Sequence, residues 1–495
     1  MSNSLSRMHA GRMHTIDVIV VGSGPNGMAA AVTMARAGLS VRVYERNPTI
    51  GGGARTVEST LPGFRHDVCS AVHPMALASG FFQKFQLDRR IKLLVPEVSY
   101  AHPLDNGRAG VAWRDLDRTV ESLGPDGRAW KRLFGPLVDH VAEVAQFTGS
   151  NMLQLPRHPL TALRLAARIL EQGSPAWNAR FVEDEAPAML TGVNAHSIRR
   201  MPSLETAAVG LVLATHAHAK GWPIPVGGSQ SIIEAMAADL IAHGGEIVTD
   251  TEVSSLAEMP SARAVILDVS ARSLASIAGD ALPARYSKAL RRFRYGNAAA
   301  KVDFALSAPV PWANEHVRAA GTVHLGGSRA ELAASEAEVA AGRHPRSPYV
   351  LASQPTLFDP SRAPLGFQTL WAYTHVPAGS TVDPTEAVTA QIERYAPGFR
   401  DVIVASSSQS AIEVERYNPN YIGGDIAAGA PSLWQLVARP VLSVDPWRTP
   451  TAGIYLCSSS TPPGPGVHGL PGYYAARSAL AAQFGITTPP RLGLD

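Results

Sequence analysis

Apolar and polar positions near the N-terminus follow the order strand, helix, strand. Residues 16–21 form a β-branched apolar run that is short enough for a buried parallel strand. A helical pattern rich in Ala and Met follows and ends at Gly38, where glycine suits a left-handed C-cap. A second apolar run, residues 39–44, ends in Glu45. This pattern predicts a βαβ unit.

A glycine-rich turn, Gly22-x-Gly24-x-x-Gly27, lies between the first predicted strand and the helix. Gly22 allows a tight turn, Gly24 lets the backbone approach a pyrophosphate, and Gly27 lets the helix pack on the strand. The helix N-terminus then offers N–H groups and a positive dipole end to phosphates. Glu45 lies 21 residues after Gly24, the right distance to accept both hydroxyls of an adenosine ribose. The turn predicts a dinucleotide site, and an acid at position 45 disfavours NADP.

Three later stretches return the chain to this unit. A helix from Gln230 to His243 precedes a strand that ends near Val253, and residues 261–268 form another central strand pattern. Near the C-terminus, a strand at 453–457 enters a Ser/Pro/Gly turn that leads to a helix from Tyr473 to Phe484. The nucleotide domain is therefore predicted to be discontinuous.

The intervening segments predict a second lobe. Residues 116–222 are mostly helical by period, and strand patterns at 297–306, 349–354 and 369–375 suggest a mixed sheet that supports a binding cavity. The predicted fold is α/β, with a Rossmann-like domain and a mixed-sheet and helical substrate domain. We assign residues 14–100, 223–290 and 441–495 to the nucleotide domain, and 101–222 and 291–440 to the substrate domain.

Two surface and cavity features of the second lobe have alternative interpretations. Aromatic residues of strands are more often core than ligand contacts, but six side chains together suit a long apolar ligand. They are Trp371, Tyr373, His375, Tyr417, Tyr421 and Trp434. The apolar helix 159–172 carries Arg164 and Arg168 four residues apart, which suits either an anionic lipid surface or the solvated face of an ordinary packed helix.

Composition narrows the function. In this chain of 495 residues, 45% hydrophobic and 17% charged residues indicate an ordered protein with a large interior or an apolar cavity. Its net charge of +3 gives no case for nucleic-acid binding. Cys69 and Cys457 are far apart, so we expect neither a redox cysteine pair nor a metal site. We see no secretory signal in the first fifteen residues and no bilayer-spanning run. We expect a cytoplasmic protein, with peripheral membrane contact left open.

A second glycine cluster carries a family resemblance. Gly51-Gly52-Gly53-Ala54-Arg55-Thr56 follows the ribose acid, and Leu61-Pro62-Gly63-Phe64-Arg65-His66-Asp67 comes next. Here the chain resembles the FAD-dependent superfamily of amine oxidases and phytoene desaturases, and the Pro- and Gly-rich segment 453–472 is similar to its C-terminal FAD segment. The chain departs in placing Gly53 and Ala54 before Arg55, and in Ser458–Ser460 where relatives have glycine.

The resemblance implies FAD as the cofactor. It implies that the residues holding FAD are Gly22, Gly24, Pro25, Asn26, Gly27, Glu45, Arg46, Gly52, Gly53, Ala54, Arg55, Val253, Ser459, Val467 and His468. The C-terminal helix would direct its N–H groups and positive dipole end to the flavin. His73 and His468 are our candidates for proton handling, because histidine titrates near neutral pH.

The resemblance also bounds the reaction. With no second nucleotide motif, the expected enzyme is a desaturase-like oxidoreductase that moves hydride between a hydrophobic substrate, of isoprenoid or polyene type, and the flavin. Oxygen or a quinone would accept the electrons. Relatives also isomerise or saturate double bonds or oxidise amines, so these remain alternatives. GDP-dissociation inhibitors use a similar architecture as a binding scaffold without flavin, which is the non-enzyme alternative.

Overall fold

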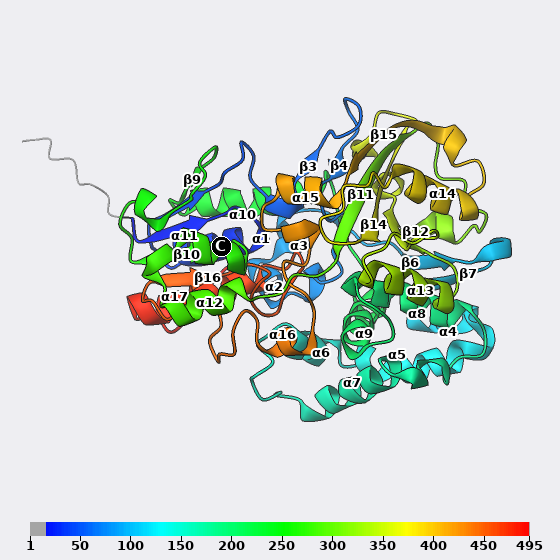
Figure 1. Cartoon of the computed structure of the whole chain (residues 1–495), viewed down its shortest axis with the longest axis horizontal. Helices are drawn as coiled ribbons and strands as arrows, with labels where there is room; N and C mark the ends of the chain where they lie inside the picture. The colour runs from blue at the N-terminus through cyan, green and yellow to red at the C-terminus, as the bar shows by residue number, and fades with distance from the viewer. Residues whose placement is uncertain (1–15, 495) are drawn as a thin grey trace, which may run out of the picture.

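The computed structural model describes residues 16–494 and divides them between two sheets of different construction (Figure 1). The first sheet is fully parallel, in the order β16-β10-β1-β2-β9. Its strands are β1 (Val18–Val21), β2 (Val41–Tyr44), β9 (Glu246–Val248), β10 (Ala264–Leu267) and β16 (Ile454–Leu456). The second sheet is mixed. The predicted fold class is thereby confirmed.

Both faces of the parallel sheet are covered by helices, as its apolar strands require. Val18 and Val20 point to one core, while Ile19 and Val21 point to another on the opposite face. The first face is covered by α1 (Pro25–Arg36), α10 (Gln230–Ala242) and α17 (Leu470–Phe484). The second is covered by α11 (Ala271–Ile277) and α12 (Ala284–Arg291).

The C-terminal helix packs directly on the first helix. A Cβ atom added to Gly472 of α17 would lie 1.8 Å from the carbonyl oxygen of Asn26 in α1, so only glycine permits this approach. The helix begins at Leu470, three residues before the predicted start at Tyr473. Gly469 is its N-cap, and a proline, which suits a first turn, follows Leu470. The predicted strand ending near Val253 is shorter, since β9 ends at Val248 and a loop continues from there.

The second sheet has the order β15-β11-β14-β13-β12-β6-β7 and is antiparallel except for the β12–β6 pair. Its strands are β6 (Val98–Pro103), β7 (Ala109–Trp113), β11 (Ala298–Leu306), β12 (Ala320–Leu325), β13 (Val350–Ser353), β14 (Gln368–Val376) and β15 (Ile403–Gln409). All five strands of the parallel sheet fall within the ranges assigned to the nucleotide domain. The strand β6 crosses the assigned boundary between residues 100 and 101, so that division stays a prediction.

Alternation along β14 separates the two faces of the mixed sheet. Leu370 and Ala372 join an apolar core that is covered by α14 (Thr385–Tyr395). Trp371 and Tyr373 point the other way. That other face lies beneath α8 (Glu185–Asn194), α9 (Leu204–Ala219) and α13 (Arg329–Ala340).

Eight further helices and two small ribbons complete the named elements. The helices are α2 (Gly80–Phe85), α3 (Leu87–Arg90), α4 (Leu116–Ser122), α5 (Gly127–Val138), α6 (Val141–Thr148), α7 (Pro159–Gln172), α15 (Ala411–Tyr417) and α16 (Leu433–Val437). Two small ribbons pair β3 (Thr56–Val57) with β4 (His66–Asp67) and β5 (Leu93–Leu94) with β8 (Ile224–Pro225). Within residues 16–494, no helix has both the length and the apolar character needed to cross a bilayer.

Candidate functional site

A cleft of about 180 Å³ opens at the carboxyl ends of β1, β2 and β10. This edge of a parallel sheet is where open α/β folds bind their ligands. The cleft is lined by eleven of the predicted cofactor residues, namely Gly22, Gly24, Pro25, Asn26, Glu45, Arg46, Gly52, Gly53, Arg55, Val253 and Ser459. The other four, Gly27, Ala54, Val467 and His468, do not line it.

The glycine turn has the geometry expected of a phosphate-binding turn. Gly22 has a φ of 97°, a backbone conformation that other residues rarely adopt. A Cβ atom on Gly27 would lie 2.0 Å from the carbonyl oxygen of Gly22, so glycine is what allows α1 to pack against the end of β1. Gly27 therefore supports the cleft through the packing of α1 on β1, without lining it.

Glu45 is buried at the end of β2 with an exposed fraction of 5%. One carboxylate oxygen accepts hydrogen bonds from the backbone N–H of Ser23 (3.1 Å) and its hydroxyl (2.6 Å). The other accepts from Asn47 (2.9 Å to its backbone nitrogen) and from Arg55 (3.0 Å). Burial alone would raise the pKa of Glu45, but these bonds and the Arg55 charge hold it below its ordinary value. Glu45 is thus an ionised acceptor at the cleft.

Asp268 is a cleft residue that the sequence analysis did not identify as part of the site. It follows β10, and its carboxylate accepts a 2.8 Å hydrogen bond from the backbone N–H of Gly27 at the start of α1. Burial, with a smaller contribution from the nearby Glu45 charge, raises the pKa of Asp268 to about 7. Its position in the sequence could have indicated this role, because Asp268 directly follows a central strand, as Glu45 follows β2.

Side chains of the second lobe extend across the opening of the cleft. Tyr421 reaches the glycine cluster, where a Cβ atom on Gly53 would lie 2.1 Å from its hydroxyl oxygen. Arg55 donates 3.0 Å hydrogen bonds to Tyr417 and to Glu45. Small-molecule pockets usually hold about 300–1,000 Å³. The smaller volume of this cleft reflects these side chains, which fold across it.

The two predicted proton-handling residues lie outside the cleft lining. The Nε2 atom of His73 is 2.8 Å from the hydroxyl of Ser229, and the backbone N–H of Leu470 donates to Nδ1 of His468 (3.2 Å). Both histidines are almost fully buried, and burial lowers the pKa of each to about 4. They are therefore neutral at pH 7 in this arrangement, and their catalytic role stays a prediction.

A second group of buried polar side chains covers the inner face of the mixed sheet, the face beneath α8, α9 and α13. His375 of β14 is 2.6 Å from a carboxylate oxygen of Glu336 in α13, and both residues are buried. His196 is 2.9 Å from His324 of β12. On β11, Lys301 forms an ion pair with Asp303. Such groups are costly to bury unless they are paired.

Several of these groups keep an atom without a hydrogen-bond partner among the described residues. The atoms are Trp371 Nε1, His375 Nε2, Glu336 Oε2, His324 Nδ1, Thr322 Oγ1 and Tyr100 hydroxyl. Buried polar atoms are nearly always satisfied, so a group of unsatisfied atoms on one face calls for an explanation such as a ligand. The strand pattern identified Trp371, Tyr373 and His375, but Glu336 lies in a helix that alternates small and charged residues and gave no signal.

Cys69 connects this inner face to the nucleotide cleft. A Cβ atom on Gly53 would lie 3.3 Å from that of Cys69 and still closer to the Tyr421 hydroxyl, so the three residues meet. Burial raises the pKa of the Cys69 thiol, while a hydrogen bond with Tyr421 and the charge of Lys301 on β11 lower it. Cys69 and Cys457 are both free thiols. The inner face and the cleft are therefore neighbouring parts of one site.

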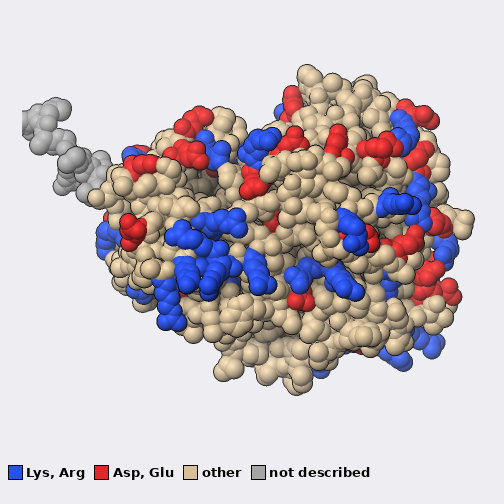
Figure 2. Space-filling model, viewed as in Figure 1, with Lys and Arg blue, Asp and Glu red and all other residues tan. Residues whose placement is uncertain are grey.

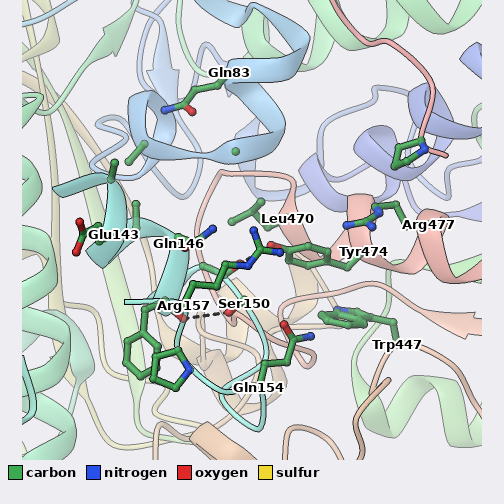
Figure 3. A pocket seen from close by; sticks show the side chains of 18 of the residues that line it. Gln83, Glu143, Gln146, Ser150, Gln154, Arg157, Trp447, Leu470, Tyr474 and Arg477 are labelled. Atoms are coloured by element: carbon green, nitrogen blue, oxygen red, sulfur yellow. Dashed lines mark hydrogen bonds between the residues drawn. The ribbon is translucent and has the colours of Figure 1, made fainter. Parts of the chain in front are cut away.

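A larger cavity lies elsewhere and shares no lining residue with the cleft. It holds about 630 Å³ and is bounded by α6, α17 and the loop before α7. Figure 3 shows Arg157 of that loop reaching toward Tyr474 of α17, with Arg477 beyond it. This cavity lies on the side of α17 that faces away from the glycine turn. The nucleotide site is therefore not the larger of these two cavities.

Comparison with known sequences supports the nucleotide fold. Residues 20–85 match the NAD(P)-binding Rossmann-like domain family. The chain is 27% identical to pyridine nucleotide-disulfide oxidoreductase domain-containing protein 2 of Rattus norvegicus, over 93% of this chain and 92% of that protein. It is 26% identical to an uncharacterized protein of Mycobacterium tuberculosis, over 94% of this chain and 97% of that protein.

Solved structures extend the likeness to both lobes. Cyclohexylamine oxidase from Brevibacterium oxydans superposes with a TM-score of 0.58 at 16% identity, covering 94% of this chain and 98% of that one. Putrescine oxidase bound to putrescine gives a TM-score of 0.56 at 19% identity, with the same coverage. UDP-galactopyranose mutase gives 0.55 at 13% identity, covering 97% and 96%. The chain shares the fold of these proteins.

Proposed function

We propose that the protein is an FAD-dependent oxidoreductase. The observation that carries this proposal is the convergence at one sheet edge of the glycine turn, the ionised Glu45 and the C-terminal turn at Ser459. The turn at Ser459 lies 414 residues after Glu45 in the sequence, whereas the glycine turn lies close before Glu45. A fold shared with amine oxidases over nearly the whole chain supports the same conclusion.

The donor set of the cleft suits a flavin adenine dinucleotide. Glu45 offers carboxylate oxygens to ribose hydroxyls, and the backbone at Gly24 and the start of α1 offer N–H groups to a pyrophosphate. The buried side-chain oxygen of Asn26 has no partner among the described residues and also faces this turn. Tyr421 would leave its contact with Gly53 to admit a dinucleotide of this length.

FAD, when bound, supplies an acceptor for a hydride from the substrate. The protein's own residues would bind the substrate, orient it and exclude water. On this proposal the substrate lies against the inner face of the mixed sheet, next to Cys69. The aromatic pair Trp371 and Tyr373, whose ring centroids are 5.3 Å apart, would hold its apolar part.

The inner face favours a substrate that also carries a hydrogen-bonding group. A pure hydrocarbon of the phytoene type would leave Glu336, His375 and Trp371 unsatisfied. Desaturation of an apolar chain with a polar end group is therefore our preferred form of the predicted desaturase activity. A carotenoid-like substrate stays a prediction from sequence.

Amine oxidation is a second candidate because of one observation. Glu336 presents a buried carboxylate oxygen without a partner near an aromatic pair, and this combination suits a cationic amino group. Redox-neutral isomerisation and double-bond saturation have no comparable support on the inner face.

The test begins with the absorption spectrum of protein purified in the presence of FAD. Flavin bands, with FAD released by acid, are expected. Anaerobic mixing with a panel of amines and a panel of alkenes that carry a polar end group should then bleach the flavin with one class only. A protein that stays colourless and fails to retain added FAD would instead favour the binding-scaffold alternative.

A further inference from the structure

Exposed apolar side chains are concentrated on one part of the surface. Among the described residues, ten of the eighteen large hydrophobic side chains that are exposed lie in the segments 152–170 and 433–444. They are Met152, Leu153, Leu155, Leu160, Leu163, Leu170, Leu433, Trp434, Leu442 and Val444. We call these ten residues the apolar rim. Leu155 is 92% exposed, Val444 80% and Trp434 67%, so they project into solvent.

The two segments of the apolar rim are held together. The side-chain nitrogen of Asn151 donates hydrogen bonds to the carbonyl oxygens of Ser443 (2.9 Å) and Val444 (3.2 Å). The loop that carries Leu153 and Leu155 therefore lies beside the loop that carries Leu442 and Val444. Exposed apolar residues scattered singly need no explanation, but a contiguous group marks an interaction surface.

A basic segment borders the apolar rim. Residues 282–295, which include α12, expose Arg285, Lys288, Arg291, Arg292 and Arg294. Gln435 of α16 ties this segment to the rim, because its side chain accepts from the backbone N–H of Arg294 (2.8 Å) and donates to the carbonyl oxygen of the same residue (2.9 Å). Arg294, near the end of this segment, thus lies beside α16 (Leu433–Val437), which carries Leu433 and Trp434.

Among the described residues these cations form no ion pairs, although Asp280 lines a surface pocket together with Lys288, Arg291 and Arg292. The segments 152–170, 282–295 and 430–444 contain no Asp or Glu, and Arg157 and Arg164 add two exposed cations. No ion pair joins any of these exposed cations to an acidic side chain among the described residues. Figure 2 shows a nearly uncharged lower surface over α7 and α16, bordered above by a row of Lys and Arg side chains.

We propose that this surface docks on an anionic lipid bilayer, with the apolar rim inserted among the acyl chains and the basic segment against the headgroups. Projecting apolar side chains bordered by unpaired cations match the two components of peripheral membrane binding, which are apolar burial and attraction to anionic lipid. Trp434 suits the headgroup level, where its amphipathic ring is favoured. The proposal does not depend on FAD or on the reaction.

The cavity of about 630 Å³ opens at the same place. Leu155 belongs both to the apolar rim and to the cavity wall, and Arg157 follows in the same loop (Figure 3). Docking would therefore bring the mouth of this cavity to the membrane surface.

The test measures co-sedimentation of the full-length protein with vesicles. One set is phosphatidylcholine alone and the other is phosphatidylcholine mixed with phosphatidylglycerol. We expect binding to the mixed vesicles to be at least tenfold tighter and to weaken as salt is raised, because salt screens the basic segment. The double variant Leu155→Ser/Val444→Ser and the double variant Arg292→Gln/Arg294→Gln should each weaken it about tenfold or more.

Matched controls keep the same chemistry elsewhere on the surface. Leu365→Ser removes a fully exposed leucine, and Arg346→Gln removes an exposed arginine, both far from the rim in sequence. Both should bind mixed vesicles like the parent protein. Equal binding by rim and control variants would overturn the proposal. So would absence of vesicle binding together with a dimer, seen by light scattering, that the rim variant dissociates, because the rim would then be an interface between two copies.

Discussion

The two sheets place their polar groups in opposite ways. In the parallel sheet the strand interiors are apolar on both faces, and the functional polar groups lie just past the strand ends, as Glu45 and Asp268 do. In the mixed sheet the polar groups lie within the strands, across one whole buried face, as His375 and Lys301 do. The first arrangement suits a ligand held at an edge, and the second suits a ligand enclosed between layers.

The difference separates what the two regions contribute. The edge site is built largely from backbone N–H groups, glycines and the carboxyl groups of Glu45 and Asp268, so on the proposed function it recognises a cofactor common to many proteins. The inner face is built from particular side chains, so on the proposed function it carries the choice of substrate. Changes at the edge should alter cofactor retention, whereas changes on the inner face should alter turnover with the cofactor retained.

The largest effect is expected from Gly27→Ala, which tests whether the edge site depends on backbone packing. The new methyl group would overlap the carbonyl oxygen of Gly22 at 2.0 Å and push α1 from β1. We expect the free energy of unfolding to fall by about 3 kcal/mol or more, measured by urea denaturation. Gly80→Ala, where a Cβ meets nothing within 4 Å, should change it by less than about 0.5 kcal/mol. Equal stability of the two variants would contradict this account of the turn.

Next comes Glu336→Gln, which tests the role of the inner face. Removing the charge beside His375 should slow anaerobic flavin reduction by about 100-fold or more, as loss of a proton-handling or charge-binding group does. The flavin content per protein should not change. Glu338→Gln, two residues further along α13 and paired with Arg343 in solvent, is the control. Loss of flavin from the Glu336 variant would argue against the division between the two regions.

A smaller effect is expected from Glu45→Gln, the matching change at the edge. On the proposed function it would weaken charge-assisted hydrogen bonds to the ribose, each worth about 1.5–3 kcal/mol, so FAD should bind about 10- to 100-fold more weakly in a fluorescence titration. Glu246→Gln, a surface acid of the edge strand β9, should leave the affinity as it is. The rate of the FAD-saturated variant should remain close to that of the parent, and a large fall in that rate would contradict the comparison.

The smallest effect concerns the pH dependence of stability. Burial raises the pKa of Asp268 to about 7 in the folded protein, above its ordinary value near 3.8, so the folded state binds a proton more tightly than the unfolded state. Stability from this group is therefore greatest at low pH and is lost as the pH rises through about 7. Between pH 6 and pH 8 the flavin-free protein should lose about 1 to 2 kcal/mol by this route.

Asp268→Asn should remove that loss, as urea denaturation at the two pH values would reveal. The pH dependence of the parent protein should then exceed that of the variant. An identical pH dependence in both proteins would mean that the carboxyl of Asp268 is ionised throughout this range.

The edge site could be predicted from sequence because its signals are local. The strand, turn, helix and acid of residues 16–45 are adjacent in the chain, and their spacing follows from the rise of a strand and a helix. The inner face could not be predicted in the same way, because Glu336 meets His375 only through the packing of α13 on β14. Asp268 lies between these cases, since its strand was predicted but not its contact with Gly27.

Side-chain environment was the least predictable property. Trp434 was grouped with the aromatic residues suited to a ligand, yet it is 67% exposed and belongs to the apolar rim. Its apolar character was visible in the sequence, but its position depends on how α16 is tied to Arg294. Both interpretations of the helix 159–172, a lipid-binding surface and an ordinary packed helix, remain open for the same reason. One of its faces packs on the protein, while Leu160 and Leu163 remain exposed.

The contact of α17 with α1 has a consequence for the order of events during synthesis. The parallel sheet needs β10 from mid-chain and β16 from near the end, and Gly472 seats the last helix against Asn26. A chain that emerges from the ribosome in sequence order cannot complete this layer until residues 454–484 have emerged. Until then the βαβ unit of residues 18–44 keeps apolar surface uncovered, a state that favours aggregation.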